Sequence, residues 1–130
     1  MISHITLGLM DLGRETAFYD AVMAALGIRK LPEEGDDESV AYGYPGKALP
    51  VVYVQPTFDG RPPTWGNGTH VAFDAENRQQ VQYFHAAARK QGGSSDGEPG
   101  FRPDYSHPYY AAYVRDAVGN KLQAVCRKEE

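Results

Sequence analysis

Two histidines in matching local sequences are the residues best suited to chemistry in this chain of 130 residues. His4 lies in the run SHITL at residues 3–7, and His70 lies in the run THVAF at residues 69–73. An imidazole ring binds metal ions or exchanges a proton near neutral pH. We therefore expect His4 and His70 to line a common pocket, the alternative being that each is only a hydrogen-bonded polar residue of a strand.

The two histidines belong to a longer internal repeat. Three further pairs share their separation of 66 residues: Phe18 with Phe84, Ala21 with Ala87, and Gly27 with Gly93. A fixed period indicates repeated structural units. We predict two modules, at about residues 1–57 and 68–128, joined by a Pro- and Gly-rich linker at about 58–67.

Each module is expected to fold as βαβββ. Helical spacing of apolar residues predicts helices over residues 14–26 and 77–91, with Asp11 as N-cap of the first and Gly27 just past its end. In each module an alternating strand precedes the helix. Strands are predicted at 28–31, 39–44, 49–55, 110–115 and 121–127, and residues 94–108 are expected to be mainly an irregular loop.

Strand alternation decides which side chains share a face. Ile5 and Leu7 should pack against a helix, which puts His4 on the opposite face. The same pattern directs Val71 and Phe73 toward a helix, with His70 on the other side.

Composition excludes several classes of protein. The formal net charge of −4 and the lack of a basic patch argue against nucleic acid as a partner. No apolar run approaches the length of a membrane span, and no signal peptide precedes the first strand. Cys126 is the only cysteine, which excludes an intrachain disulfide, suits the cytoplasm, and leaves only histidine and oxygen ligands for a metal site. The turn at residues 43–47 lacks P-loop spacing, so no nucleotide cofactor is expected.

The ordered set of these segments resembles the vicinal oxygen chelate superfamily of glyoxalases, bleomycin-resistance proteins and extradiol dioxygenases, and small glyoxalase-like proteins most closely. The segments that carry the resemblance are residues 3–7, 11–12, 18–19, 68–73, 112–116, 119–120 and 122–125. The resemblance implies an α+β fold in which two paired βαβββ modules form a half-open, curled mixed sheet around a pocket, with the helices outside. It also implies a homodimer, with the modules paired either within one chain or by exchange between chains.

The resemblance further implies a divalent metal (Zn, Ni, Mn or Fe) held by His4, His70 and Gln123. Gln123 stands where the family usually has a glutamate, and Tyr53 matches the position of a second family glutamate. An amide oxygen is a poorer ligand than a carboxylate for such ions and cannot act as a base. The predicted metal site is therefore degenerate.

Other side chains could complete the pocket. His107 and Tyr53 are candidates for proton transfer, and Tyr113, Tyr105 and Trp65 are candidates for contact with substrate. Tyr113 should lie opposite Gln123, because both are equally far from the hairpin loop at 116–120. His85, on the second helix, reads better as a surface residue.

Two functions follow from these residues. The first is a glyoxalase-like enzyme, a metal-assisted lyase or isomerase acting on a small oxygenated metabolite, related to lactoylglutathione lyase or to the dioxygenases. The alternative is a metal-free protein that binds or sequesters a small molecule, of the bleomycin-resistance type. The sequence feature that distinguishes the two functions is the lack of a carboxylate at position 123.

Overall fold

The computed structural model describes residues 1–105 and 108–129, which form two βαβββ modules. Module one contains β1 (His4–Gly8), α1 (Leu12–Ala24), β2 (Arg29–Lys30), the 3-10 helix η1 (Pro32–Glu34), β3 (Val40–Gly43) and β4 (Val51–Gln55). Module two contains β5 (Val71–Asp74), α2 (Arg78–Lys90), β6 (Ser94–Phe101), β7 (Tyr110–Arg115) and β8 (Lys121–Cys126). The repeat predicted from the histidines is therefore a repeat of structure.

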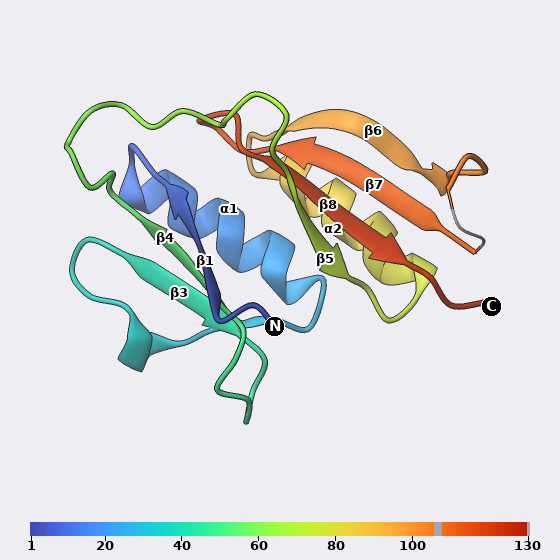
Figure 1. The fold of residues 1–130 in the computed structure, drawn as a ribbon, viewed down its shortest axis with the longest axis horizontal. Helices are drawn as coiled ribbons and strands as arrows, with labels where there is room; N and C mark the ends of the chain where they lie inside the picture. The colour runs from blue at the N-terminus through green and yellow to red at the C-terminus, as the bar shows by residue number, and fades with distance from the viewer. Residues whose placement is uncertain (106–107, 130) are drawn as a thin grey trace.

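Each module has one four-stranded mixed sheet. The strand orders are β1-β4-β3-β2 and β5-β8-β7-β6, with β1 parallel to β4 and β5 parallel to β8. Figure 1 shows the two sheets side by side, with β1 and β5 at the facing edges. The sheets do not close into a barrel, which fits the α+β, two-module fold expected from the sequence.

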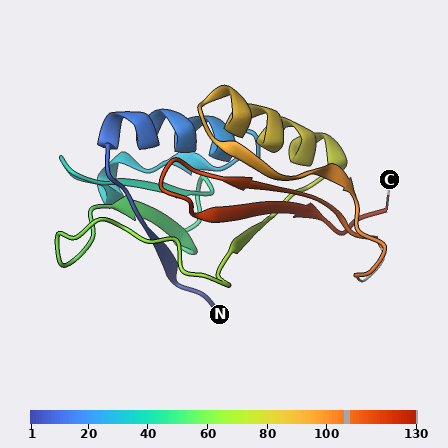
Figure 2. The same ribbon diagram turned by 90° about the horizontal axis from the view of Figure 1, so that it is seen from above.

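Both helices cover the same side of the two sheets. Figure 2 shows α1 and α2 side by side above the strands, while the N-terminus lies on the side away from the helices. Asp11 caps α1 by accepting a hydrogen bond from the Arg14 N–H, and Asn77 caps α2 in the same way through the Gln80 N–H. Neither helix of the described residues is long and apolar enough to cross a membrane.

The core lies between the helices and the sheets. Leu7 and Phe73 are buried there, and Ile5 and Val71 pack against the same cluster, as the alternation predicted. Cys126 is fully buried among them. The opposite face of each sheet carries no helix, and we call it the open face.

The strand β6 corrects the expectation of an irregular loop over residues 94–108. Residues 94–101 pair with β7 as an edge strand, with register shifts around Gly97. A Cβ at Gly97 would lie 2.9 Å from Tyr113 Cδ2, so a glycine is needed for the close pairing. Edge position and irregular register accommodate the Gly and Pro residues that suggested a loop.

The presence of β6 also corrects the placement of His85, which is 5% exposed rather than on the surface. Its Nε2 lies 2.8 Å from Ser95 Oγ and 3.8 Å from Glu98 Oε2, both on β6. Burial lowers the pKa of His85; Glu98 opposes this shift and Arg89 adds to it.

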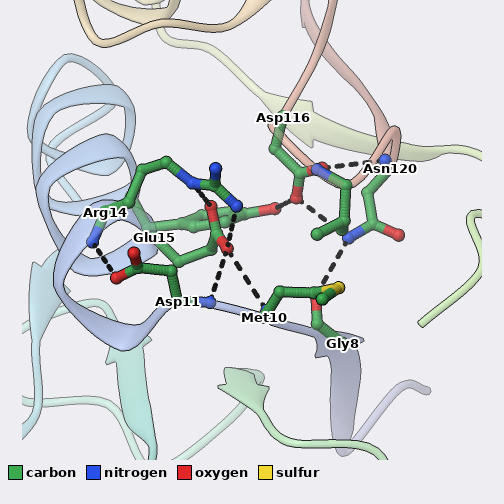
Figure 3. A network of polar contacts seen from close by, with 9 residues as sticks. Gly8, Met10, Asp11, Arg14, Glu15, Asp116 and Asn120 are labelled. Atoms are coloured by element: carbon green, nitrogen blue, oxygen red, sulfur yellow. Dashed lines mark hydrogen bonds and ion pairs between the residues drawn. The ribbon is translucent and has the colours of Figure 1, made fainter. Parts of the chain in front are cut away.

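A buried carboxylate joins the modules (Figure 3). Tyr19 on α1 donates to Asp116 Oδ2 at 2.5 Å, and Asn120 Nδ2 donates to the same oxygen at 2.9 Å. Asn120 Nδ2 also lies 3.4 Å from the carbonyl oxygen of Gly8, at the end of β1. Burial and the Asp116 carboxylate hold the pKa of Tyr19 well above its usual value. We call Tyr19, Asp116 and Asn120 the inter-module clasp.

We expect Tyr19→Phe to destabilise the protein by about 1–3 kcal/mol, because a buried carboxylate loses one of its donors. Urea denaturation measures this loss. Tyr83→Phe is the matched control, since Tyr83 is 55% exposed and lies outside the clasp. Equal free energies of unfolding for the two variants would contradict a stabilising clasp.

We expect stability to fall between pH 7.5 and 5.5, by more in the wild type than in His85→Gln. The folded-state pKa of His85 is depressed below its ordinary value of 6.5. The unfolded chain therefore takes up the proton first as the pH falls, which favours unfolding. Melting temperatures across this range give the comparison, and parallel pH profiles would refute the role assigned to His85.

Candidate functional site

The open face of module one presents His4 beside Tyr53. Their ring centroids are 5.6 Å apart in an edge-to-face arrangement, and the His4 Nδ1 atom lies 3.0 Å from Ser3 Oγ. Strand β1 places His4 opposite Val51, and β4 places Tyr53 opposite Thr6. Both rings point away from the helices, because the alternate residues of each strand are in the core.

A carboxylate that the sequence did not single out lies beside this pair. The Tyr53 hydroxyl donates to Glu34 Oε2 at 3.4 Å. Glu34 ends the 3-10 helix η1, inside the acidic run at residues 33–38 that reads as a solvated connection. Nothing in its spacing marks Glu34, since its approach to Tyr53 depends on how η1 folds back beside β3 and β4.

The open face of module two presents Gln123 and Tyr113. They are directly opposite in the β7–β8 pairing, which confirms the register predicted from the hairpin. Gln123 is only 1% exposed, and its Nε2 donates to the Tyr109 hydroxyl at 2.7 Å. The amide is therefore already engaged within module two.

Aromatic rings surround Tyr113. His70 is edge-to-face with it at 5.9 Å, and Tyr105 and Tyr109 are 5.0 Å apart nearby. Burial raises the pKa of Tyr113 to about 12, helped by Tyr109 and Tyr105 and opposed by the charge of Arg102. The Tyr113 phenol therefore stays protonated at neutral pH, where it can donate a hydrogen bond but cannot act as a base.

Trp65 lies at the end of the linker, over the β7–β8 hairpin. A Cβ added to Gly119 would come 2.8 Å from Trp65 Cδ1, and the Arg115 guanidinium lies 5.2 Å from the centre of the Trp65 ring. Trp65 and His70 line one cavity of about 260 Å³. Trp65 therefore packs against the hairpin and lines this cavity, while its contact with substrate stays a prediction.

The two histidines occupy opposite ends of adjacent strands within one chain. Asn120 contacts Gly8, so the end of β1 lies beside the beginning of β8, and β5 begins at that same end because it pairs in parallel with β8. His70 lies just before β5, at this end of the strands. His4 lies at the other end of β1, four residues before Gly8, which is about 13 Å along the strand at the usual rise per residue. Figure 1 shows β1 and β5 running in opposite directions. No described cavity holds both histidines.

The described residues of one copy do not bring together side chains that fit a resident divalent metal ion. Across residues 1–105 and 108–129, no group of three His, Cys, Asp or Glu side chains could hold such an ion. The amide N–H of Gln123 donates a hydrogen bond to the Tyr109 hydroxyl. His4 lies in module one, at the beginning of β1. His107, the sequence candidate for proton transfer, falls outside the described residues.

Solved structures share this architecture, although no family model and no curated protein sequence matches the chain. A glyoxalase/bleomycin resistance protein from Albidiferax ferrireducens aligns with a TM-score of 0.85 and 34% identity, over 98% of this chain and 99% of that one. A glyoxalase/bleomycin resistance protein/dioxygenase family enzyme from Burkholderia phytofirmans aligns with a TM-score of 0.73 and 16% identity, over 97% and 98%. A fosfomycin resistance protein from Listeria monocytogenes aligns with a TM-score of 0.64 and 18% identity, over 100% and 93%.

We expect Gly119→Ala to displace Trp65 from the hairpin, with a shifted Trp fluorescence maximum and a lower free energy of unfolding. Trp65 is the only tryptophan, so the emission comes from this one side chain. Gly60→Ala is the control for backbone strain, because Gly60 also has a positive φ but has no atom near its Cβ position. Unchanged emission in Gly119→Ala would refute the close contact between Trp65 and Gly119.

Proposed function

Because the chain belongs to the glyoxalase/bleomycin resistance protein family, we propose that it binds a small oxygenated molecule in a site completed by a second copy of itself. The observation that carries the proposal is the division of the open face. One half-site, His4 with Tyr53 and Glu34, lies on module one. The other, His70 with Tyr113 and Gln123, lies on module two and does not meet it within the chain.

Two-fold symmetry can bring together the two half-sites that do not meet within one chain. In a symmetric dimer in which module one of one copy faces module two of its partner, the same contact is repeated on the other side. Each of the two sites would then contain one half-site from each copy. The open face suits such a contact, because it carries unburied aromatic side chains and no helix covers it. This is the pairing by exchange between chains that the sequence left open.

The chemistry of each side chain indicates its role in this site. The rings of Tyr53 and Tyr113 give flat apolar contact with polar ends, which is how tyrosine holds small ligands. The protonated Tyr113 hydroxyl donates to an oxygen of the ligand. Tyr105 and Trp65 border the same half-site, and Glu34, beside Tyr53, is the carboxylate available to accept a proton. His107 stays a candidate for proton transfer.

Binding without a resident metal is the reading that we favour. The Gln123 amide is neutral, almost fully buried and hydrogen-bonded to Tyr109. Divalent ions of the borderline and hard classes favour anionic oxygen, and Gln123 offers only a neutral amide oxygen. These contacts support a ligand-binding or sequestering protein.

A metal-assisted lyase or isomerase is the second candidate. It is favoured by the placement of both histidines on the open face, at equivalent positions of the repeat. The ion would need His4 from one copy, with His70 and Gln123 from the partner. Zn²⁺, Ni²⁺, Mn²⁺ and Fe²⁺ are the ions to test.

Complementation between variants tests the shared site. We expect the wild type to have twice the 14.3 kDa mass of one chain in light scattering. His4→Ala and His70→Ala alone should each disrupt both sites of the dimer. A mixed dimer of the two variants should regain about half of the wild-type sites, since one site then receives both native histidines.

Two readouts follow this experiment. Metal content after equilibration with each ion separates the two candidate functions. About one ion per wild-type chain, with half of that metal content in the mixed dimer, supports the metal-assisted enzyme. The lack of any bound ion supports metal-free binding. For metal-free binding, the readout is a panel of small oxygenated and aromatic compounds screened by thermal shift, with the mixed dimer again giving half of the bound ligand. A monomeric wild type, or a mixed dimer that regains nothing, would falsify the shared site.

A further inference from the structure

The cavity beside Trp65 is lined by cationic side chains to which the proposed function gives no role. It has a volume of about 260 Å³, and its walls are Trp65, residues 67–70, Arg115 and Lys121. None of these described lining residues is acidic. Asn67, Thr69 and His70 add neutral polar groups to the two cations.

The two cations both pair with the carboxylate of Asp96. Asp96 Oδ2 lies 3.1 Å from Arg115 Nε and 3.5 Å from Lys121 Nζ. One negative charge therefore faces two positive charges, which leaves an excess of positive charge at the cavity. This excess is local, because the chain as a whole carries a formal net charge of −4.

Neighbouring groups hold both cations in place. Arg115 Nη1 donates to the Gly119 carbonyl oxygen at 2.9 Å, and its guanidinium stacks on Trp65. The Lys121 ammonium lies 5.1 Å from the centre of the Tyr113 ring. Their side chains are only 31% and 30% exposed, so part of their hydration is already lost before any ligand arrives. Fixed and partly desolvated cations bind anions better than mobile surface ones.

The cavity also adjoins the half-site of module two. His70 lines the cavity and is edge-to-face with Tyr113, while Lys121 contacts both the cavity and the Tyr113 ring. A small molecule with one end against Tyr113 could therefore extend its other end past His70 toward the cations. The volume suits a small charged group rather than a drug-sized ligand.

We propose that this cavity is an anion subsite, and that the ligand of the open face carries a carboxylate or phosphate group held by Arg115 and Lys121 beside Trp65. This inference rests on the proposed function for the other end of the ligand. It also narrows the ligand from a small oxygenated molecule to a small organic anion. Phosphate and carboxylate are the two sources of that charge.

Trp65 fluorescence tests the subsite directly, because this tryptophan forms one wall and is the only one in the chain. The wild type is titrated with inorganic phosphate and with malonate, at an ionic strength kept constant with NaCl, and with glycerol as the neutral control. We expect a saturable change with at least one anion and none with glycerol. The anion that binds more tightly identifies the preferred group.

Two variants should move the affinity in opposite directions. Lys121→Gln should weaken binding by about tenfold or more, through loss of a charge-assisted contact. Asp96→Asn should tighten binding by several-fold, because it removes the carboxylate that competes with the anion. Arg61→Gln is the matched control, since Arg61 lies in the same linker as Trp65 but outside the cavity, and its affinity should equal that of the wild type. Circular dichroism confirms that each variant is folded.

The absence of a saturable change, or equal affinities in Lys121→Gln and the wild type, would overturn the subsite. Weaker binding by Asp96→Asn would do the same. These results are independent of the mixed-dimer experiment, which changes only the histidines. A shared site without anion binding would refute the subsite alone, and anion binding without complementation would refute the shared site alone.

Discussion

The buried carboxylate of Asp116 is the interaction on which the arrangement of the two modules depends. It receives the Tyr19 hydroxyl from α1 and the Asn120 amide from its own hairpin, and the same amide reaches the carbonyl oxygen of Gly8. A buried polar group is costly unless it is hydrogen-bonded, so this contact tolerates little displacement. The clasp therefore fixes the end of β1 against the beginning of β8.

That constraint determines which residues can meet. With the end of β1 held beside the beginning of β8, the edge strands β1 and β5 run in opposite directions (Figure 1). His4 and His70 are equivalent in the repeat, yet this geometry separates them within the chain. A fold built from two similar modules thus yields two half-sites, and the proposed dimer is the symmetric way to join them.

The two half-sites differ although their backbones are related. Module one offers His4, Tyr53 and a carboxylate from η1. Module two offers His70, Gln123 and a group of tyrosines bordered by the cations of β7 and β8. Such a division suits a ligand with unlike ends, one oxygenated and one anionic. The asymmetry lies in the side chains, since the strands of the two modules occupy equivalent positions in the βαβββ order.

The sequence by itself determined the local structure. The period of 66 residues, the N-cap at Asp11, and the alternation of Ile5 and Leu7 with His4 predicted the modules, the helices and the faces of the strands. The pairing of Tyr113 with Gln123 followed from the length of one hairpin. Apart from the repeat, each of these features depends on residues close together in the chain, where spacing is sufficient information.

Only the tertiary structure decided the rest. Strand β6 forms because β7 is there to pair with it, and it covers His85, which local sequence places on the surface. Glu34 reaches Tyr53 because η1 folds back beside the sheet. The separation of His4 from His70 depends on Tyr19 and Asp116, which are 97 residues apart in the chain. Residue spacing specifies which face a side chain occupies, but contacts over such distances decide which faces come together.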